Sequence, residues 1–326
     1  MGRQIALVTA REALVLDEDM PPLREALAAL GAEVATPEWD DAGMDWARFD
    51  VAVLRSTWDY MDRLGEFLAW ADRCGEQTRL LNPPGLVRWN TDKHYLLDLA
   101  RAGVPVVPTR FVEPGGPAAD ALARFLAGGR DALSVGEACA FEEFVVKPAV
   151  GVGSRDAARF RRADLARAAA HLSRLLEAGR AALLQPYLAR VDEAGETALM
   201  HFDGRFSHAI RKSALLRPDG PLVAGLFAPE KIAARVPGAD ELAVAASACA
   251  AVADWRPLYT RVDLIRDAAG RPVVLELEMT EPSLFFPFAP GSAAVFARAI
   301  LAAASRPAGR AVAEFPEADA SRPDLA

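Results

Sequence analysis

Cysteine is scarce in this 326-residue chain, and long apolar runs are absent from it. Its three cysteines, Cys74, Cys139 and Cys249, are too few and too far apart for a disulfide framework or a CxxC metal site. No uncharged apolar run reaches the roughly 18 residues of a membrane helix, and no signal peptide is recognisable. We therefore expect a cytoplasmic protein with no membrane partner, large enough to build its core without disulfides or structural metal.

Positive charge is also in deficit. Asp and Glu total 45 against 37 Lys and Arg, a formal net charge of -8, which argues against a general nucleic-acid-binding surface. Only four of the basic residues are lysine. Because an ammonium acts on phosphate as a point charge whereas arginine acts as a planar fork, such scarce lysines are candidates for phosphate contacts. The alternative is that the four lysines lie on the surface by chance and have no special role: Lys93, Lys147, Lys212 and Lys231.

The first 85 residues alternate apolar strands with a helical pattern. Buried strands are predicted at 4–9 and 50–54, and leucines at helical spacing predict a helix over 20–30. This alternation is typical of βαβ units and a parallel sheet, whose ligands collect beyond the carboxyl ends of the strands. Residues 55–60 follow such an end and are rich in polar and aromatic side chains. They supply four candidate substrate contacts: Arg55, Ser56, Trp58 and Asp59.

Two of these candidates have an evident chemistry. Arg55 could bind a substrate carboxylate, and Asp59 could bind an ammonium. Trp58 and Tyr60 have a second interpretation, which is that they cap the core of the domain. Ser283, just past the last predicted strand, is a further candidate for substrate binding.

The rest of the chain divides into two mixed units. The segment Asn82-Pro-Pro-Gly is typical of a linker, and a strand-rich pattern begins near residue 181. Residues 217–238 are rich in proline and glycine and predict a long loop, which we regard as a candidate lid. We predict an α/β fold whose later parts are α+β, with domains over 1–85, 86–183 and 184–305 and a tail over 306–326.

Charged residues alternate along two strands near the C-terminal end. A hairpin would bring Asp263 beside Glu276 and Glu278, with Arg261 on the same face. Three carboxylates on one surface repel each other unless a cation lies among them, and Mg²⁺ prefers oxygen ligands that it shares with phosphates. Arg261 suits an anion that gains charge during a reaction. The competing interpretation, an exposed hairpin with its polar residues outward, explains the apolar flanks poorly.

Two further clusters are candidates for nucleotide contacts. A glycine loop follows a lysine at a strand end, where an ammonium and backbone N–H groups can surround phosphate oxygens, although the pattern is not a Walker P-loop. These residues are Lys147, Gly151, Gly153 and Ser154. A strand that breaks at a proline could bond an adenine edge, with a carboxylate for the ribose: Gln185, Tyr187, Leu188 and Glu196. Taken alone, the first cluster is better explained as a hairpin turn, and the second equally well as a strand end.

Together these elements resemble the ATP-grasp superfamily, which includes D-alanine–D-alanine ligase and bacterial glutathione synthetase. The resemblance covers about residues 82–300 and rests on Asp92-Lys93, on Val146-Lys-Pro with its glycine loop, and on the Arg-x-Asp…Glu-x-Glu pattern of the last two strands. It implies an N-terminal pre-ATP-grasp domain followed by two subdomains that grip ATP. Glu278 stands where this superfamily more often has asparagine, which leaves open which carboxylate bridges the metals.

The resemblance also implies roles for single residues. Lys93, Lys147 and Lys212 would contact the phosphates of ATP, and Lys212 and Arg261 would be catalytic. Two Mg²⁺ ions, or Mn²⁺ in their place, would be held by three carboxylates: Asp263, Glu276 and Glu278.

A closer resemblance runs nearly end to end, to the O-ureido-serine cyclo-ligase family of antibiotic biosynthesis. It rests on residues 55–60, on Trp89-Asn-Thr-Asp-Lys93 and on residues 276–286. It implies that ATP activates the carboxylate of a small amino-acid substrate as an acylphosphate, which a nitrogen of the same molecule then displaces. A dipeptide-forming ligase of L- or D-amino acids and a phosphotransferase without a ligation step remain alternatives. A homodimer is expected from the resemblance alone.

Overall fold

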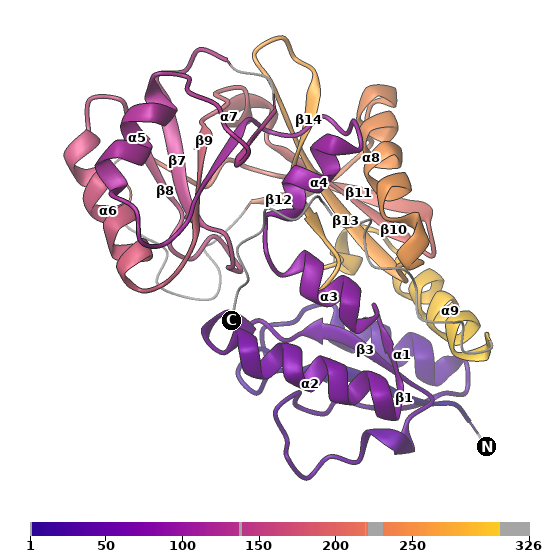
Figure 1. Cartoon of the computed structure of the whole chain (residues 1–326). Helices are drawn as coiled ribbons and strands as arrows, with labels where there is room; N and C mark the ends of the chain where they lie inside the picture. Colours follow the sequence, from indigo (N-terminus) through magenta and orange to yellow (C-terminus); the bar gives the residue numbers. More distant parts are fainter. Residues whose placement is uncertain (1, 137–138, 219, 221–230, 307–326) are drawn as a thin grey trace.

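The computed structural model describes residues 2–136, 139–218, 220 and 231–306. Three sheets form three lobes (Figure 1), one parallel and two antiparallel, which confirms the predicted α/β class with α+β later parts. None of the described helices is long and apolar enough to cross a bilayer. Short 3₁₀ turns occupy Trp46–Arg48, Tyr60–Asp62, Ala253–Trp255 and Phe286–Phe288.

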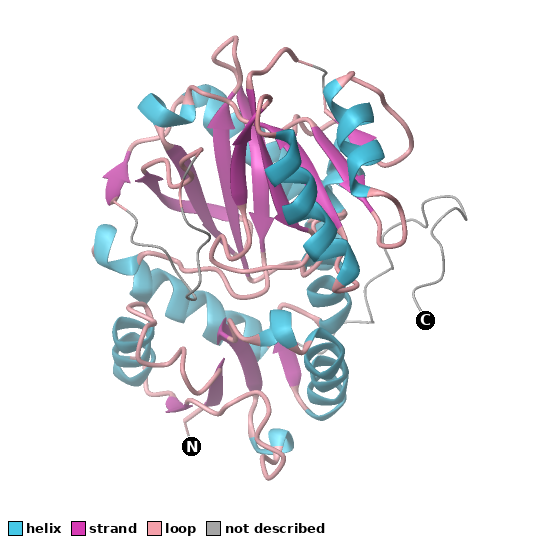
Figure 2. Cartoon of the chain, turned by 90° about the vertical axis from the view of Figure 1, so that its left-hand side faces the viewer, coloured by secondary structure: helices cyan, strands magenta, loops and turns pink. Residues whose placement is uncertain are grey.

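The N-terminal sheet comprises β1 (Gln4–Thr9), β2 (Glu33–Ala35), β3 (Val51–Ser56) and β4 (Arg79–Leu81), with helices α1 (Met20–Ala29) and α2 (Leu64–Gln77). The strands are all parallel, in the order β2-β1-β3-β4. Helix α1 packs on the face that carries Leu7, and α2 packs on the other face with an aromatic cluster around Trp70. Because both faces are covered, β1 and β3 are buried along almost their whole length, as their continuous apolar runs predict. Figure 2 shows this sheet below the two larger ones.

The central sheet has the order β6-β5-β9-β7-β8, and every pair of neighbouring strands in it is antiparallel. Its helices cover one face, where Phe144 and Val146 join their core. The other face is turned toward the interior of the molecule. The elements are β5 (Thr109–Val112), α5 (Ala118–Leu126), β6 (Ser134–Val135), β7 (Glu143–Pro148), β8 (Ala158–Arg161), α6 (Leu165–Glu177) and β9 (Ala182–Pro186).

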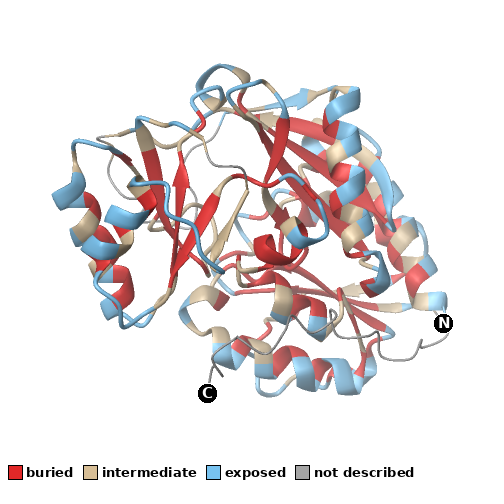
Figure 3. Ribbon diagram, turned by 45° about the horizontal axis from the view of Figure 1, so that its top comes forward, coloured by how far each residue is buried: buried red, intermediate tan, exposed pale blue. Residues whose placement is uncertain are grey.

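The C-terminal sheet is antiparallel, in the order β12-β11-β10-β13-β14, with α8 packed on β13 and β14. Figure 3 shows its strands buried and the outer faces of its helices exposed. The elements are α7 (Val191–Ala194), β10 (Glu196–Phe202), β11 (Arg205–Lys212), β12 (Ile232–Arg235), α8 (Ala239–Ala251), β13 (Tyr259–Arg266), β14 (Pro272–Glu278) and α9 (Ser292–Ser305).

The prediction of a long loop over residues 217–238 is wrong at its C-terminal end. Residues 232–235 form the edge strand β12, which pairs with β11 from Ala209↔Arg235 to Lys212↔Ile232. Proline and glycine nearby hid this short strand, because edge strands need little apolar patterning. Residue 219 and residues 221–230, the centre of the predicted lid, lie outside the described residues, as does the tail from 307.

The predicted linker at 82–85 is instead a rigid joint. Helix α3 (Pro84–Asn90) begins within it, and α4 (Tyr95–Arg101) follows. The Asn82 amide accepts a bond from Leu258 N at 2.6 Å and donates to the carbonyls at the ends of β13 and β14. Asn90 likewise brackets β14, donating to Leu277 O at 2.7 Å and accepting from Met279 N at 2.7 Å.

Two of the predicted domain boundaries cut across packed elements. The boundary at 183/184 falls inside β9, which belongs to the central sheet. Residues 86–106 were assigned to the central unit, yet α3 and α4 pack with Val262 and Leu277 of the C-terminal sheet. Helix α9 packs against α1, so the end of the chain shares a core with its beginning.

Candidate active site

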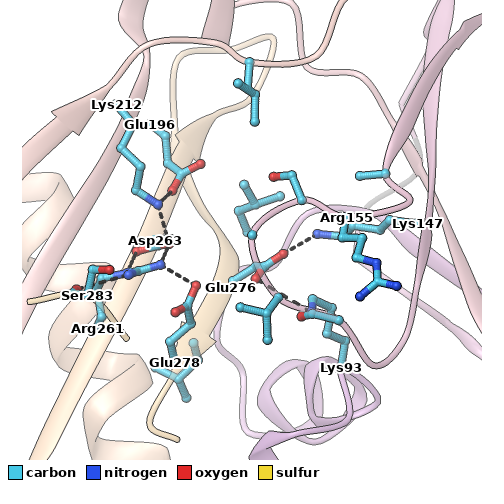
Figure 4. A pocket seen from close by; sticks show the side chains of 18 of the residues that line it. Lys93, Lys147, Arg155, Glu196, Lys212, Arg261, Asp263, Glu276, Glu278 and Ser283 are labelled. Atoms are coloured by element: carbon cyan, nitrogen blue, oxygen red, sulfur yellow. Dashed lines mark hydrogen bonds and ion pairs between the residues drawn. The ribbon is translucent and has the colours of Figure 1, made fainter. Parts of the chain in front are cut away.

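A cavity of about 430 Å³, the central cavity, lies where the three sheets meet. β7 contributes Lys147 to its lining, β13 contributes Asp263, and the segment after β3 contributes Trp58. Strand alternation explains the placement of Lys147, because its neighbour Val146 enters the helix-covered core on the opposite face of the sheet. Figure 4 shows the charged side chains that gather in the cavity.

The register of β13 and β14 brings one arginine and three carboxylates together. Arg261 lies opposite Glu278, and Asp263 lies opposite Glu276, as the predicted hairpin requires. Arg261 donates from Nε and Nη2 to the two oxygens of Asp263, both at 2.9 Å, and also bonds Glu278. Its Nη1 donates to the carbonyl of Ser283 at 3.1 Å. One arginine therefore neutralises carboxylates on both strands.

Glu276 is held from the other side by two lysines. Lys147 Nζ lies 2.6 Å from its Oε1, and Lys93 Nζ lies 3.9 Å from its Oε2. Lys93 also donates to the carbonyl of Gly151 at 3.0 Å. In Figure 4 these lysines lie on one side of Glu276 and Arg261 lies on the other.

Lys212, the last residue of β11, contacts two more carboxylates. Its Nζ lies 3.0 Å from Asp263 Oδ2 and also pairs with Glu196, which is directly opposite in the β10–β11 ladder. Three of the four lysines thus converge on the central cavity, whereas Lys231 is exposed. The scarcity of lysine in the sequence therefore singled out three residues that line the cavity and one exposed residue, and the phosphate contacts stay a prediction.

These contacts shift the pKa of the carboxylates in opposite directions. Burial would raise the pKa of Glu276, but Lys147 and Lys93 outweigh it and hold the pKa at about 2. Asp263 also has a lowered pKa, because Arg261 and Lys212 outweigh its burial. Burial raises the pKa of Glu196 to about 8 against the attraction of Lys212, with help from Asp263. The cavity therefore mixes ionised and protonated acids near neutral pH.

The glycine loop after β7 lines the cavity with Gly151, Gly153 and Ser154. Gly153 and Ser154 have positive φ angles of 63° and 61°, a turn conformation that points successive N–H groups to one side. The loop touches the N-terminal lobe, since Arg155 Nη1 lies 2.8 Å from Asp62 Oδ2 and the loop's two valines pack on the aromatic cluster. Residues 149–155 therefore bridge two lobes over the cavity.

The strand predicted to meet an adenine ring also reaches the cavity. Gln185, Tyr187 and Leu188 all line it. Gln185 Nε2 donates to Thr109 Oγ1 at 2.9 Å, and the Tyr187 hydroxyl donates to Asp192 at 2.5 Å. These bonds fix the side chains and leave the broken strand end facing the cavity.

The substrate candidates after β3 divide into two groups. Trp58 lines the cavity, as does Ser283. Arg55 and Ser56 are fully buried and do not line it, and Asp59 is engaged by Trp39 Nε1 at 2.8 Å and by Arg63. The predicted direct contacts of Arg55, Ser56 and Asp59 with substrate are therefore not provided by this structure.

Arg55 instead helps to hold the segment after β14. Its Nη2 donates to the carbonyl of Pro282 at 3.2 Å and lies 3.7 Å from Asp19. Asp19 in turn accepts the backbone N–H groups of residues 284–286 at 2.6 to 3.0 Å. An arginine at a strand end looked like a ligand, but its role is to position the loop that carries Ser283.

Sequence reasoning missed several cavity residues. Asp19, Tyr60 and Glu281 are buried and line the cavity. Glu281 and Tyr60 lie inside two of the three motifs that carried the closer resemblance, which was a usable signal. The sequence carries no such signal for Asp19, because the loop between β1 and α1 has no recognisable pattern.

Asp263, Glu276 and Glu278 offer the oxygen donors that Mg²⁺ prefers. In this structure each is bound by a lysine or an arginine. Among the residues that the structure describes, no three acidic, histidine or cysteine side chains lie close enough to hold one ion. The donor chemistry fits magnesium, and metal binding requires the cations to exchange these carboxylates for other anions.

Two antiparallel sheets that close on a cavity lined by lysines and carboxylates, behind a parallel-sheet domain, define an ATP-grasp ligase. The chain belongs to the DcsG family of these ATP-dependent enzymes. A family model described as the N-terminal domain of D-cycloserine synthetase DcsG matches residues 5–82. The chain is 44% identical over 301 residues to the cycloserine biosynthesis protein DcsG of Streptomyces lavendulae, covering 91% of this chain and 97% of the relative.

Solved structures agree with this family. The crystal structure of D-cycloserine synthetase DcsG superposes with a TM-score of 0.84 at 44% identity, covering 92% of this chain and 99% of that chain. The ATP-grasp ligase PsnB, complexed with a minimal precursor, has a TM-score of 0.61 at 21% identity, covering 93% and 99%. D-Alanine–D-alanine ligase from Bacillus anthracis, complexed with ATP, has a TM-score of 0.60 at 15% identity, covering 92% and 95%. The last two likenesses concern the fold alone.

Proposed function

We propose that this enzyme uses ATP to activate the carboxylate of an amino acid or small amino-acid derivative and closes a ring with a nitrogen of the same molecule, as an O-ureido-serine cyclo-ligase does. The single observation that carries this proposal is the convergence of three lysines, one arginine and three carboxylates on one cavity. The similarity to DcsG supports the cyclising reaction and the small substrate.

The proposed chemistry has two steps. The substrate carboxylate attacks the γ-phosphorus of ATP, forming an acylphosphate and releasing ADP. The nitrogen then attacks the acyl carbon, phosphate leaves, and the nitrogen loses a proton. Arg261 stabilises the charge on the transferred phosphoryl group with Lys212, and the glycine loop, which bridges two lobes over the cavity, shields the acylphosphate from water.

The nucleotide lies between the central and C-terminal sheets in this proposal. Lys93, Lys147 and Lys212 move from their carboxylates to the phosphate oxygens, and the N–H groups at Gly151, Gly153 and Ser154 cover them. The base would meet Gln185, Tyr187 and Leu188, and the ribose would meet Glu196. Two Mg²⁺ ions, which neutralise the triphosphate when bound, would be held by the three carboxylates: Asp263, Glu276 and Glu278.

The test is a product assay. The purified enzyme is mixed with ATP, Mg²⁺ and each of a panel of amino acids that includes O-ureidoserine, ADP release is followed, and products are identified by mass spectrometry. We expect ADP and a cyclised product in equal amounts. A linear dipeptide would instead make the enzyme an intermolecular ligase, and a stable phosphorylated substrate would make it a phosphotransferase.

A matched pair of lysine variants tests the site in the same assay. Lys147→Met removes an ammonium from the cavity and should lower kcat/KM for ATP by roughly 100-fold or more. Lys231→Met removes the exposed lysine and should change nothing. Equal activity of the two variants would contradict the proposed phosphate contacts.

A further inference from the structure

Glu281 is a cavity carboxylate that the phosphate and metal roles leave unused. It follows the end of β14 by three residues, is 9% exposed, and lines the central cavity. The cavity lysines and Arg261 are engaged by other carboxylates, on β10, β13 and β14. Among the described residues no cation lies within ion-pair distance of Glu281, although several lie in the same cavity.

The N-terminal lobe holds Glu281 in place. The Trp58 indole donates to its backbone carbonyl at 2.9 Å, and the nearby Tyr60 hydroxyl favours the ionised form of its carboxyl group by lowering its pKa. Both aromatic residues come from the segment after β3, and both line the cavity. Glu281 is thus held at the side of the cavity where the N-terminal lobe meets the segment after β14.

A buried carboxylate without a cation is unfavourable, because desolvation is not offset by an ion pair. Burial, reinforced by the charge of Glu278, raises the pKa of Glu281 to about 8, against the Tyr60 bond and the charges of Lys93 and Arg261. Such a position is typical of a group whose partner arrives with a ligand. The triphosphate is an anion and cannot be that partner.

We propose that Glu281, positioned by Tyr60 and Trp58, binds the ammonium group of the amino-acid substrate. This inference rests on the proposed function and adds the residue that selects for an amino acid over a simple carboxylic acid. The ammonium and the carboxylate of an α-amino acid are on the same carbon, so the residue that binds the first must lie beside the site that activates the second. Glu281 meets that requirement, since Glu278 and Arg261 of the phosphoryl-transfer site are its neighbours.

Asp19 is a weaker candidate for the same role. Its two oxygens already accept three backbone N–H groups of the loop that follows Glu281, and its negative charge is paired with Arg55. Glu18 lines the cavity too, but its side chain is exposed at the mouth. Asp17 also lines the cavity, buried and without a cationic partner among the described residues, but it accepts the backbone N–H of Asp19 at 3.0 Å and so belongs to the same loop network. Of Asp19, Glu18 and Glu281, only Glu281 is both buried and without a cationic partner in the described structure.

The experiment compares O-ureidoserine with 3-(ureidooxy)propanoate, which differs only in lacking the amino group. Binding of each to the enzyme loaded with a non-hydrolysable ATP analogue and Mg²⁺ is measured by calorimetry for wild type, Glu281→Gln and Glu18→Gln. We expect Glu281→Gln to weaken the binding of O-ureidoserine by roughly 30-fold or more, because a buried charge partner is lost. The affinity for the deaminated compound should not change. Tyr60→Phe should give a smaller loss in the same direction.

Two results would overturn the assignment. Equal losses for both compounds would mean that Glu281 only supports the cavity wall, and a selective loss in Glu18→Gln instead would move the ammonium site to the N-terminal loop. Thermal melting and nucleotide affinity of each variant show whether the site still folds. Because binding is measured without turnover, failure of the product assay and failure of this inference are distinguishable.

Discussion

Each cation in the central cavity already holds a carboxylate, so the site carries its own counter-ions. Lys147 pairs with Glu276, and Lys212 and Arg261 share Asp263. In the proposed function, binding of a triphosphate is an exchange of partners, in which phosphate oxygens would replace carboxylates that then become free for Mg²⁺. This exchange relieves the cost that three adjacent carboxylates would otherwise impose.

His94 provides a residue-scale prediction for the pH dependence of stability. Its ring stacks on Phe111 at 4.0 Å and bonds Asp92 at 2.6 Å and Glu113 at 2.9 Å. Burial opposes its charge, but the two carboxylates outweigh burial and raise the pKa of His94 to about 9. The imidazolium therefore stabilises the fold fully below its unfolded pKa of about 6.5, and this contribution disappears as the pH rises through about 9.

We expect wild type to lose about 3 kcal/mol of unfolding free energy between pH 6.5 and 9.5 from this source. Urea unfolding at several pH values measures it. His94→Gln should be less stable at pH 6.5 and should show a flatter profile across this range. A profile as steep as that of the wild type would assign the pH dependence to other groups.

At this scale the sequence predicted the charges well and their partners poorly. Alternation on two strands was enough to place Arg261, Asp263 and Glu276 on one face. Arg55 also follows a strand, but whether it faces a ligand or a buried aspartate depends on a loop more than two hundred positions away, near Pro282. Local pattern carries no information on such contacts.

The turn before β10 matters at the scale of elements, because it sets the register of the strand that carries Glu196. Gly195 has φ 74° and ψ -173°, a region that only glycine enters readily. A Cβ at this position would lie 2.5 Å from the carbonyl oxygen of Lys212. The turn and the end of β11 are therefore packed so closely that a side chain at position 195 would clash.

Gly195→Ala should destabilise the protein by about 2–3 kcal/mol and weaken ATP binding, because relief of the clash moves the end of β11 with Lys212. Urea unfolding and nucleotide titration measure the two effects. Gly204→Ala is the matched control, since Gly204 also has a positive φ but an added Cβ would meet nothing within 4 Å. It should lose stability and keep ATP affinity. Loss of affinity in both variants would contradict the proposed link.

Elements with strong periodicity were predicted, and elements defined by tertiary contact were not. Helix α1 matches closely the helix predicted from its leucines over 20–30. Strand β12 is a short edge, and α3 begins at a proline that was taken for a linker. Proline is compatible with the first turn of a helix, so the same residue type supports both interpretations.

At the scale of the molecule, one core joins the beginning and the end of the chain. Phe296 of α9 is fully buried, and its ring lies 4.7 Å from that of Phe202 and 5.7 Å from that of Tyr259. The same core contains Leu7 of β1 and Leu23 of α1. The predicted domain limits missed this union, because composition does not reveal which helix covers which sheet.

Phe296→Ala should therefore destabilise the N-terminal and C-terminal lobes together, by about 3–5 kcal/mol. Denaturant unfolding followed by two probes measures it: tryptophan fluorescence, to which the N-terminal aromatic cluster contributes four of the six tryptophans, and far-ultraviolet circular dichroism for the whole chain. Both probes should shift to lower denaturant by the same amount. A shift in only one of them would show that the lobes unfold independently.

The packing of α9 on α1 also limits how this enzyme can be re-engineered. A chimera that takes its first lobe from a relative with another substrate would place foreign side chains against the native final helix. Such grafts should succeed only when residues 1–85 and residues 284–305 come from the same donor, since the two segments share one core although they lie far apart in the sequence.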